Sequence, residues 1–225
     1  MNTSNSAILG AAAVIFDVDG TLVDSVDFHA EAWRRTFAAF GKDVDQDEIR
    51  SQIGKGGDQL MPVFLEPEQL EREGKAIEEF RSALFKSDYL ERVRGFPDAR
   101  ELFEELLARG AVVALGSSAK GAELEAYKKA AGIGDLRLVE ATSEDVENTK
   151  PHPDIFQAAL AKTRASPGRA VVVGDSPFDA EAAVRAGVIA VGVLCGGFDE
   201  TDLRSAGMSE IYEDPSDLLR MIRAA

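Results

Sequence analysis

The stretch AVIFDVDGTLVDS, residues 13–25, decides the fold. An apolar run of strand type leads directly into two aspartates, Asp17 and Asp19, which stand one residue apart and precede Gly20 and Thr21. Two carboxylates this close repel each other. Aspartate and glycine also end strands for purely structural reasons, but the acidic pair after an apolar strand favours a chemical role.

The composition indicates a soluble, globular and acidic protein. The chain has 225 residues, of which 45% are hydrophobic and 29% charged, enough for one large core or for a core domain plus a smaller one. Its formal net charge of −15 argues against nonspecific binding to nucleic acid or to anionic membranes. A small anionic substrate would therefore need a local cluster of positive charge.

The single cysteine and the start of the chain point to the cytoplasm. Cys195 excludes an internal disulfide framework and fits a reducing compartment. The first residues lack a basic region of signal type, and their apolar stretch is too short to span a bilayer. We expect a cytoplasmic protein with a few disordered leading residues.

Strand-like apolar runs alternate with segments of helical period. In the segment 98–110, for example, Leu102, Phe103 and Leu106 share one helical face and Gly110 ends the helix. This alternation predicts a parallel sheet with helices on both faces, in which ligands bind beyond the carboxyl ends of the strands. The expected strands are residues 13–17, 111–115, 136–140, 170–174 and 189–193.

Residues 22–93 break the alternation, because they contain helical patterns and no convincing strand. Asp24 is the expected N-cap of the first of these helices and Gly41 its stop. We predict an α/β core domain with a doubly wound parallel sheet, residues 1–21 and 94–225. A small all-helical domain, residues 22–93, is inserted after the first strand and stands over the mouth of the sheet.

The acidic pair suits phosphoryl transfer. One carboxylate can attack phosphorus to form an aspartyl-phosphate, and the second can act as general acid and base. Their repulsion favours a bound divalent cation or proton sharing, and Mg²⁺ takes oxygen ligands and bridges to phosphate. Gly20 and Thr21 suit a tight loop whose backbone N–H groups face an anion.

Two further stretches supply groups for a phosphate. Ser117 and Ser118 follow a strand and precede a helix, where hydroxyls and backbone amides bind phosphate oxygens, although serine is also an ordinary N-cap. Pro151 biases Lys150 out of helical geometry, and a lysine fixed on such a loop can neutralise a nucleophile and a transferring phosphate. A lysine on a solvated face is the alternative interpretation.

A second acidic stretch follows a later strand. In VVVGDSPFDAEAAVRAG, Asp175 and Asp179 are four residues apart across a helix start. Together with Asp17 they could complete a site for a hard cation. Taken alone, Asp179 is better explained as a residue in the first turn of a helix.

The order D-x-D-G-T, serine after a strand, Lys-Pro and G-D-S-x-x-D resembles the haloacid dehalogenase superfamily of phosphotransferases over essentially the whole chain. The helical insertion looks like the C1 cap of its beta-phosphoglucomutase and phosphoglycolate phosphatase-like branch. Dehalogenating members lack the second aspartate, so Asp19 favours phosphate chemistry over carbon–halogen cleavage.

The resemblance implies a role for each motif residue. Asp17 would be the nucleophile and Asp19 the general acid and base, while Ser117 would bind the phosphoryl group and Lys150 would stabilise it. The implied cofactor is Mg²⁺, with Mn²⁺ left open. It would be held by Asp17, the Asp19 backbone carbonyl and Asp175, with support from Asp179.

The helical segment offers the candidates for substrate specificity. In the resembling mutases, the loop corresponding to IGKGGDQLM, residues 53–61, carries an arginine that grips a second phosphate. Here Gly57 and Asp58 stand near that place, and only Lys55 is basic nearby, which favours a simple phosphatase.

Four other residues are weaker candidates. His29 and Trp33 match a pair found in both mutases and phosphatases, with His29 a candidate for substrate contact and Trp33 for packing. Lys120 could touch the substrate or be solvated, and we expect His152 to be a loop residue.

We therefore predict a Mg²⁺-dependent phosphatase acting on a small phosphorylated metabolite, such as phosphoglycolate or a sugar phosphate, through an aspartyl-phosphate. The alternatives are a beta-phosphoglucomutase-like mutase and, outside the enzymes, a phosphate-binding or receiver-like protein. Receiver domains are much shorter and need no helical cap. We expect no nucleic-acid or membrane partner, and a monomer or small homo-oligomer.

Overall fold

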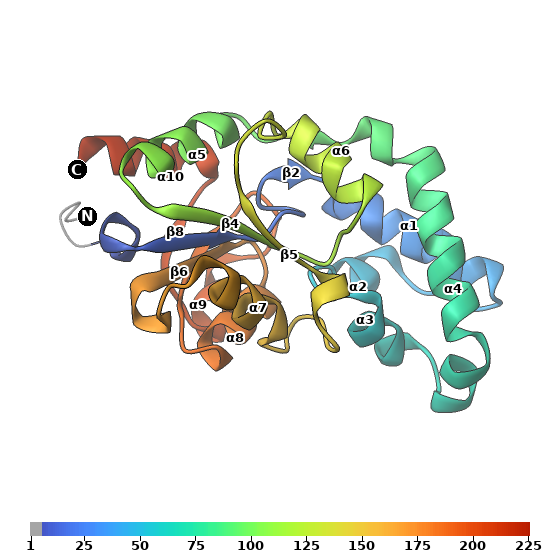
Figure 1. Ribbon diagram of the computed structural model, residues 1–225. Helices are drawn as coiled ribbons and strands as arrows, with labels where there is room; N and C mark the ends of the chain where they lie inside the picture. Colours follow the sequence, from blue (N-terminus) through green and yellow to red (C-terminus); the bar gives the residue numbers. More distant parts are fainter. Residues whose placement is uncertain (1–5) are drawn as a thin grey trace.

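A six-stranded parallel sheet runs through the centre of the computed structural model, which describes residues 6–225 (Figure 1). The expectation of disordered leading residues falls largely on 1–5, outside the described residues. The strand order is β5-β4-β1-β6-β7-β8, so the first strand lies in the middle and the chain winds outward on both sides. The strands are β1 (Ala13–Phe16), β4 (Val112–Ser117), β5 (Val139–Thr142), β6 (Ala170–Gly174), β7 (Ile189–Val193) and β8 (Met208–Tyr212). The predicted doubly wound parallel sheet is confirmed.

Three details of the strand prediction are wrong. β5 begins at Val139 rather than at residue 136, because the apolar residues before it pack against the core without pairing to β4. β4 continues to Ser117, two residues further than expected. β8 was not predicted, because this edge strand mixes polar and apolar residues, and its Glu210 accepts a hydrogen bond from the backbone N–H of Ala7 at 2.8 Å.

Helices cover both faces of the sheet, and alternate residues of β1 point to the two sides. Val14 and Phe16 belong to the core cluster under α5 (Ala99–Ala108), α6 (Ala122–Ala130) and α10 (Pro215–Ala224). Ala13 and Ile15 belong to the cluster under α7 (Asp154–Thr163), α8 (Pro177–Arg185) and α9 (Glu200–Ala206). Figure 1 shows α5 and α10 above the sheet and α7, α8 and α9 below it.

The helical segment after β1 has a hydrophobic core of its own. It consists of α1 (Val26–Ala39), α2 (Gln46–Arg50), α3 (Gly57–Phe64) and α4 (Pro67–Asp88), on the right in Figure 1. Trp33, Phe37, Ile49, Leu60 and Ile77 are buried together between these helices. Short 3-10 turns lie elsewhere at Ala7–Gly10, Leu90–Arg92, Ser143–Asp145 and Pro167–Arg169.

Two short strands join the helical segment to the rest of the chain. β2 (Val23–Asp24) pairs antiparallel with β3 (Arg94–Gly95), so the two connections run side by side. The expectation of no strand within 22–93 is therefore wrong at β2, since a two-residue strand leaves no periodic pattern. The N-cap of α1 is Ser25 rather than Asp24, whereas the helix ends just before Gly41, as predicted.

None of the helices within residues 6–225 combines the length and the apolar character needed to cross a membrane.

Phe103→Ala tests whether the core between α5 and β1 is as tightly packed as the distances indicate. The Phe103 ring is fully buried, with its centroid 4.7 Å from that of Phe16. We expect the free energy of unfolding, measured by urea denaturation, to fall by about 3–5 kcal/mol. Glu101→Ala, on the exposed side of the same helix, is the control and should cost at most about 1 kcal/mol. Similar small losses in both variants would contradict this packing.

Candidate active site

The predicted motif residues meet at the carboxyl edge of the sheet. Asp17 directly follows β1, Ser117 ends β4 and Asp175 directly follows β6. The backbone N–H of Asp17 donates to the carbonyl of Val173 at 2.9 Å, so the β1–β6 pairing extends to the first aspartate. Because β1 lies between β4 and β6, the parallel register brings these side chains to one place.

Lys150 is buried among the acids. It comes from the loop between β5 and α7, and only 2% of the residue is exposed. Its ammonium group donates to Oδ1 of Asp17 in a short hydrogen bond and to Oδ1 of Asp179 at 2.8 Å. Burial alone would lower the pKa of Lys150, but the two carboxylates raise it well above its ordinary value. The lysine therefore carries a positive charge at the centre of the site.

Three buried carboxylates surround this charge. Asp17, Asp175 and Asp179 each offer an oxygen within 4.8 Å of the others. Burial raises the pKa of Asp17 to about 7, Lys150 opposes this shift, and repulsion from Asp179 and Asp19 adds to it. Burial, and then repulsion from Asp179 and Asp17, raise the pKa of Asp175 well above its ordinary value. The single positive charge of Lys150 does not neutralise three carboxylates. Because clustered carboxylate oxygens are the ligands that Mg²⁺ prefers, these residues fit a hard divalent cation.

Asp179 also has a structural role at the start of α8. Ser176 is the N-cap of α8, and its hydroxyl and backbone N–H donate to Oδ2 of Asp179 at 2.6 and 3.1 Å. This capping box fixes the carboxylate so that its other oxygen faces Lys150. The helix-start interpretation of Asp179 is confirmed, and its contribution to a metal site stays a prediction.

Gly20 and Gly196 leave room for the Asp175 carboxylate. A Cβ atom on Gly20 would lie 2.3 Å from Oδ2 of Asp175, and one on Gly196 would lie 1.8 Å from the same oxygen. Gly20 also has a φ of +78°, which favours glycine. The Thr21 hydroxyl lies 3.0 Å from Asp175 and 3.3 Å from Asp17. Both residues of the predicted phosphate loop thus help to arrange the acids.

Asp19 is held by two neighbours from the start of the helical segment. The Ser25 hydroxyl donates to Oδ1 of Asp19 at 2.6 Å, and Nε2 of His29 lies 2.9 Å from the same oxygen. Burial alone would raise the pKa of Asp19. Electrostatic attraction to His29, together with the hydrogen bonds from His29 and Ser25, outweighs burial, so the pKa of Asp19 is lowered. The His29 ring stacks on Phe85 at 4.0 Å, and its Nε2 lies 3.0 Å from the hydroxyl of Tyr127.

A cavity of about 470 Å³ lies between the helical segment and the edge of the sheet. Asp17, Asp19 and Lys150 line it from the core side, and several predicted residues line it elsewhere. These are His29, Trp33, Lys55, Ser118 and Lys120. The predicted metal residues Asp175 and Asp179 lie behind the lining, in contact with Thr21 and Lys150.

The two serines differ in position. Ser118 lines the cavity, whereas Ser117 is fully buried and its Oγ accepts a hydrogen bond from the backbone N–H of Ala119 at 3.1 Å. Trp33 is buried and packs on Phe37 at 5.3 Å, as the packing interpretation predicts. His152 lies in the turn before α7 and is not one of the lining residues, as expected for a loop residue.

An ion pair in the cavity was missed by the sequence reasoning. Nη2 of Arg81 donates to Oε1 of Glu78 at 2.8 Å, and the guanidinium lies 5.3 Å from the centroid of the Trp33 ring. Within residues 6–225, Nε of Arg81 and Oε2 of Glu78 are buried and have no hydrogen-bond partner. Their spacing of three is typical of an ordinary surface pair on a helix, so no sequence signal distinguishes them.

Comparisons with known proteins find relatives of both the sequence and the fold. A family model described as haloacid dehalogenase-like hydrolase matches residues 14–193. The crystal structure of a hydrolase from Pseudomonas syringae superimposes with a TM-score of 0.85 at 30% identity, covering 95% of this chain and 98% of that one.

Two curated relatives cover nearly the full length. The phosphorylated carbohydrates phosphatase of Thermotoga maritima is 28% identical over 94% of this chain and 98% of its own. The phosphoglycolate phosphatase of Mannheimia succiniciproducens is 28% identical over 92% of this chain and 96% of its own. The region matched by the family model covers most of the sequence and includes Asp17, Lys150 and Asp175, so this chain belongs to the haloacid dehalogenase-like hydrolases.

Proposed function

We propose that this enzyme is a Mg²⁺-dependent phosphatase that hydrolyses a phosphate monoester of a small metabolite, such as phosphoglycolate or a sugar phosphate, through an aspartyl-phosphate on Asp17. The observation that carries the proposal is the contact of the Lys150 ammonium with Asp17 and Asp179, beside Asp175 and at the wall of a cavity. The names of the two curated relatives support the substrate class.

Asp17, Asp175 and the backbone carbonyl of Asp19 would hold the cation, with Asp179 in support. When bound, Mg²⁺ supplies charge neutralisation for the acids and for the phosphate oxygens. Lys150 supplies the second positive charge, and its two hydrogen bonds fix its direction before the substrate arrives. Such preorganised charge lowers the barrier because little rearrangement is needed during the reaction.

In the first step, an oxygen of Asp17 attacks phosphorus as the bond to the leaving oxygen breaks. This step uses the protonated form of Asp19, although His29 and Ser25 lower the pKa of this group in the substrate-free site. Asp19 donates its proton to the leaving oxygen, an alcohol leaves, and the proton that Asp19 takes up in the second step restores this form. In the second step, Asp19 accepts a proton from a water that attacks the phosphorus of the aspartyl-phosphate. Inorganic phosphate leaves and the Asp17 carboxylate is restored. Ser25 and His29 keep Asp19 oriented for both transfers.

The cavity favours hydrolysis over a mutase reaction, which must hold a second phosphate. Asp58 lines the cavity near the place where the resembling mutases carry an arginine. Arg81, which also lines it, is already paired with Glu78 at 2.8 Å. Asp58 repels a second anionic group, and Arg81 is shared with Glu78. Among the described residues, the positive charges left on the lining besides Lys150 are the lysines Lys55, Lys86 and Lys120. The preference for hydrolysis therefore rests on Asp58 standing where the resembling mutases have an arginine.

We further infer that residues 22–93 act as a cap domain on a core of residues 1–21 and 94–225, excluding bulk water and contacting the substrate. The boundary at β2 and β3 supports this division, since the chain crosses between the two parts only there. A cytoplasmic location and a monomer or small homo-oligomer complete the proposal. The single cysteine, which fits a reducing compartment, supports the location.

Inorganic phosphate release tests the reaction directly. Purified protein is incubated with phosphoglycolate, hexose 6-phosphates and p-nitrophenyl phosphate, with Mg²⁺ or with EDTA. We expect release with Mg²⁺ only, and a fall of at least about 1,000-fold in Asp17→Asn, which removes the nucleophile. Asp24→Asn changes an exposed aspartate nearby and should keep its activity. Equal release with EDTA, or an active Asp17→Asn variant, would refute the mechanism.

Asp19→Ala should separate the two steps. The p-nitrophenolate leaving group needs no proton, so the first turnover of p-nitrophenyl phosphate should survive, while hydrolysis of the aspartyl-phosphate loses its base. We expect a burst of one p-nitrophenol per enzyme, followed by a steady rate reduced about 100- to 10,000-fold. Rapid-mixing absorbance measurements would show it. A slow reaction without a burst would place Asp19 outside the second step.

The mutase alternative predicts different products. With beta-glucose 1-phosphate and Mg²⁺, we expect free glucose and inorganic phosphate in equal amounts, because Asp58 stands where the resembling mutases carry the arginine that grips a second phosphate. Phosphorus NMR of the reaction mixture resolves the products. Glucose 6-phosphate with little free phosphate would establish a mutase in spite of Asp58.

A further inference from the structure

Asp58 connects the helical segment to the loop that carries Lys150. It lies in the first turn of α3, and its Oδ2 accepts a hydrogen bond from the backbone N–H of Thr149 at 3.1 Å. The Thr149 hydroxyl donates to the other carboxylate oxygen in a short hydrogen bond. Thr149 also accepts a hydrogen bond from the backbone N–H of Gly56 at 3.0 Å. Thr149 thus makes three hydrogen bonds to two residues of the helical segment, Gly56 and Asp58.

The close approach depends on Gly56. A Cβ atom on this residue would lie 2.3 Å from Oγ1 of Thr149, so a side chain would push the two parts of the chain away from each other. Hydrogen bonds to a carboxylate are stronger than those between neutral groups. The glycine-rich stretch 53–61 therefore contacts the core backbone as well as lining the cavity.

Thr149 directly precedes Lys150, whose ammonium contacts Asp17 and Asp179. We propose that Asp58 is a positioning residue for Lys150. By holding the backbone of Thr149, Asp58 fixes the position of the neighbouring Lys150 backbone. The Lys150 ammonium group is then in place when the helical segment lies against the core. This inference rests on the proposed phosphatase function.

The helical segment contacts the rest of the chain at a second place, through Arg50, which serves as a comparison for Asp58. Nη2 of Arg50 donates to the carbonyl of Gly196 at 3.1 Å, and its Nε donates to Asp27 at 2.7 Å. The first bond joins α2 to the loop after β7, the second joins α2 to α1, and neither involves Thr149 or Lys150. Loss of Arg50 thus loosens the helical segment at another place, whereas loss of Asp58 also releases the lysine loop.

The test combines kinetics with hydrogen exchange. In Asp58→Ala we expect kcat for p-nitrophenyl phosphate to fall about 10- to 100-fold, as for the loss of a charged hydrogen bond, with KM within about 3-fold of wild type. Exchange of the amides in residues 143–156 should become faster. In Arg50→Ala, exchange of this stretch should stay close to that of the wild-type protein.

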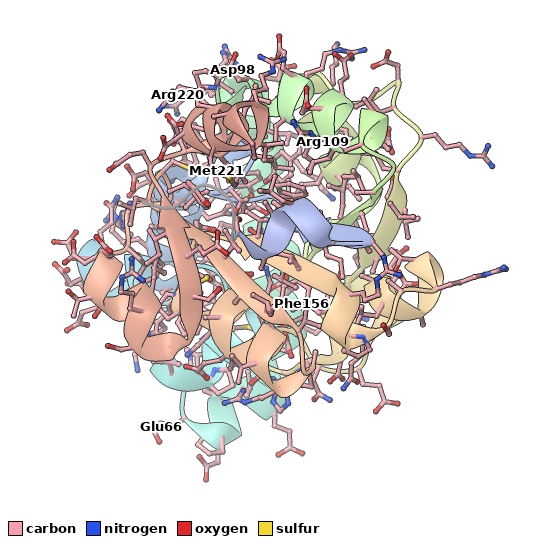
Figure 2. All side chains as sticks on the ribbon, turned by 90° about the vertical axis from the view of Figure 1, so that its left-hand side faces the viewer. Glu66, Asp98, Arg109, Phe156, Arg220 and Met221 are labelled. Atoms are coloured by element: carbon pink, nitrogen blue, oxygen red, sulfur yellow. The ribbon has the colours of Figure 1, made fainter. Side chains whose placement is uncertain are left out.

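Variants of Thr149 test its contact with Asp58, and one of them keeps the hydroxyl group. Thr149→Ser keeps the hydroxyl and should keep its activity, whereas Thr149→Val should lose part of kcat. The double variant Asp58→Ala with Thr149→Val should lose less activity than the two single losses combined, because both changes remove the bond between the Thr149 hydroxyl and Asp58, while Thr149→Val alone also removes the acceptor for Gly56. Glu66→Ala removes an exposed carboxylate at the periphery of the helical segment (Figure 2) and is the charge-matched control.

Three results would overturn the inference. A raised KM with unchanged kcat in Asp58→Ala would mean that Asp58 acts on the substrate. Unchanged exchange in residues 143–156, or equal acceleration in Arg50→Ala, would show that Asp58 has no specific hold on the lysine loop. If the wild-type protein itself releases no phosphate, the proposed function fails, and exchange still decides whether Asp58 holds this loop.

Discussion

Lys150 places one positive charge between the buried carboxylates of Asp17 and Asp179, and the rest of the site is arranged around this contact. Removing one partner of such a buried group leaves an uncompensated charge, which costs more than the pair contributes. The fold meets this constraint by bringing four separate segments to one edge of the sheet. β1 and β6 supply acids, the loop before α7 supplies the lysine, and the first turn of α8 fixes Asp179. Parallel strands suit this task because all their carboxyl ends face the same way.

Much of the fold and the centre of the site could be predicted because their signals are local. A buried strand that ends in an acid, as at Asp17 or Asp175, is visible within a few residues. The features that were missed depend on tertiary packing. Glu78 and Arg81 look like an ordinary helical ion pair until the packing of α4 turns them toward the cavity. The pairing of Asp58 with Thr149 joins residues 91 positions apart. The edge strand β8 was missed because half-exposed strands carry weak patterns.

The residues proposed for the reaction and most of the cavity lining come from different parts of the chain. The groups proposed for attack and charge neutralisation come from the edge of the sheet and from the loop before α7, while most of the other residues that line the cavity lie in the helical segment 22–93. Asp19 lies at the junction, because it follows the first strand but is held by Ser25 and His29. The same chemistry can therefore serve different substrates when the helical wall changes, and membership of the family does not by itself name the substrate.

The crowding of Asp175 between Gly20 and Gly196 has a consequence for judging related sequences. With Oδ2 only 1.8 Å from where a Cβ on Gly196 would stand, one added methyl group must displace the carboxylate. A homologue could then keep every acid and the lysine and still be inactive. Motif residues alone do not identify a working enzyme of this kind, because the spaces that glycines leave open are as much part of the site as the side chains that fill them.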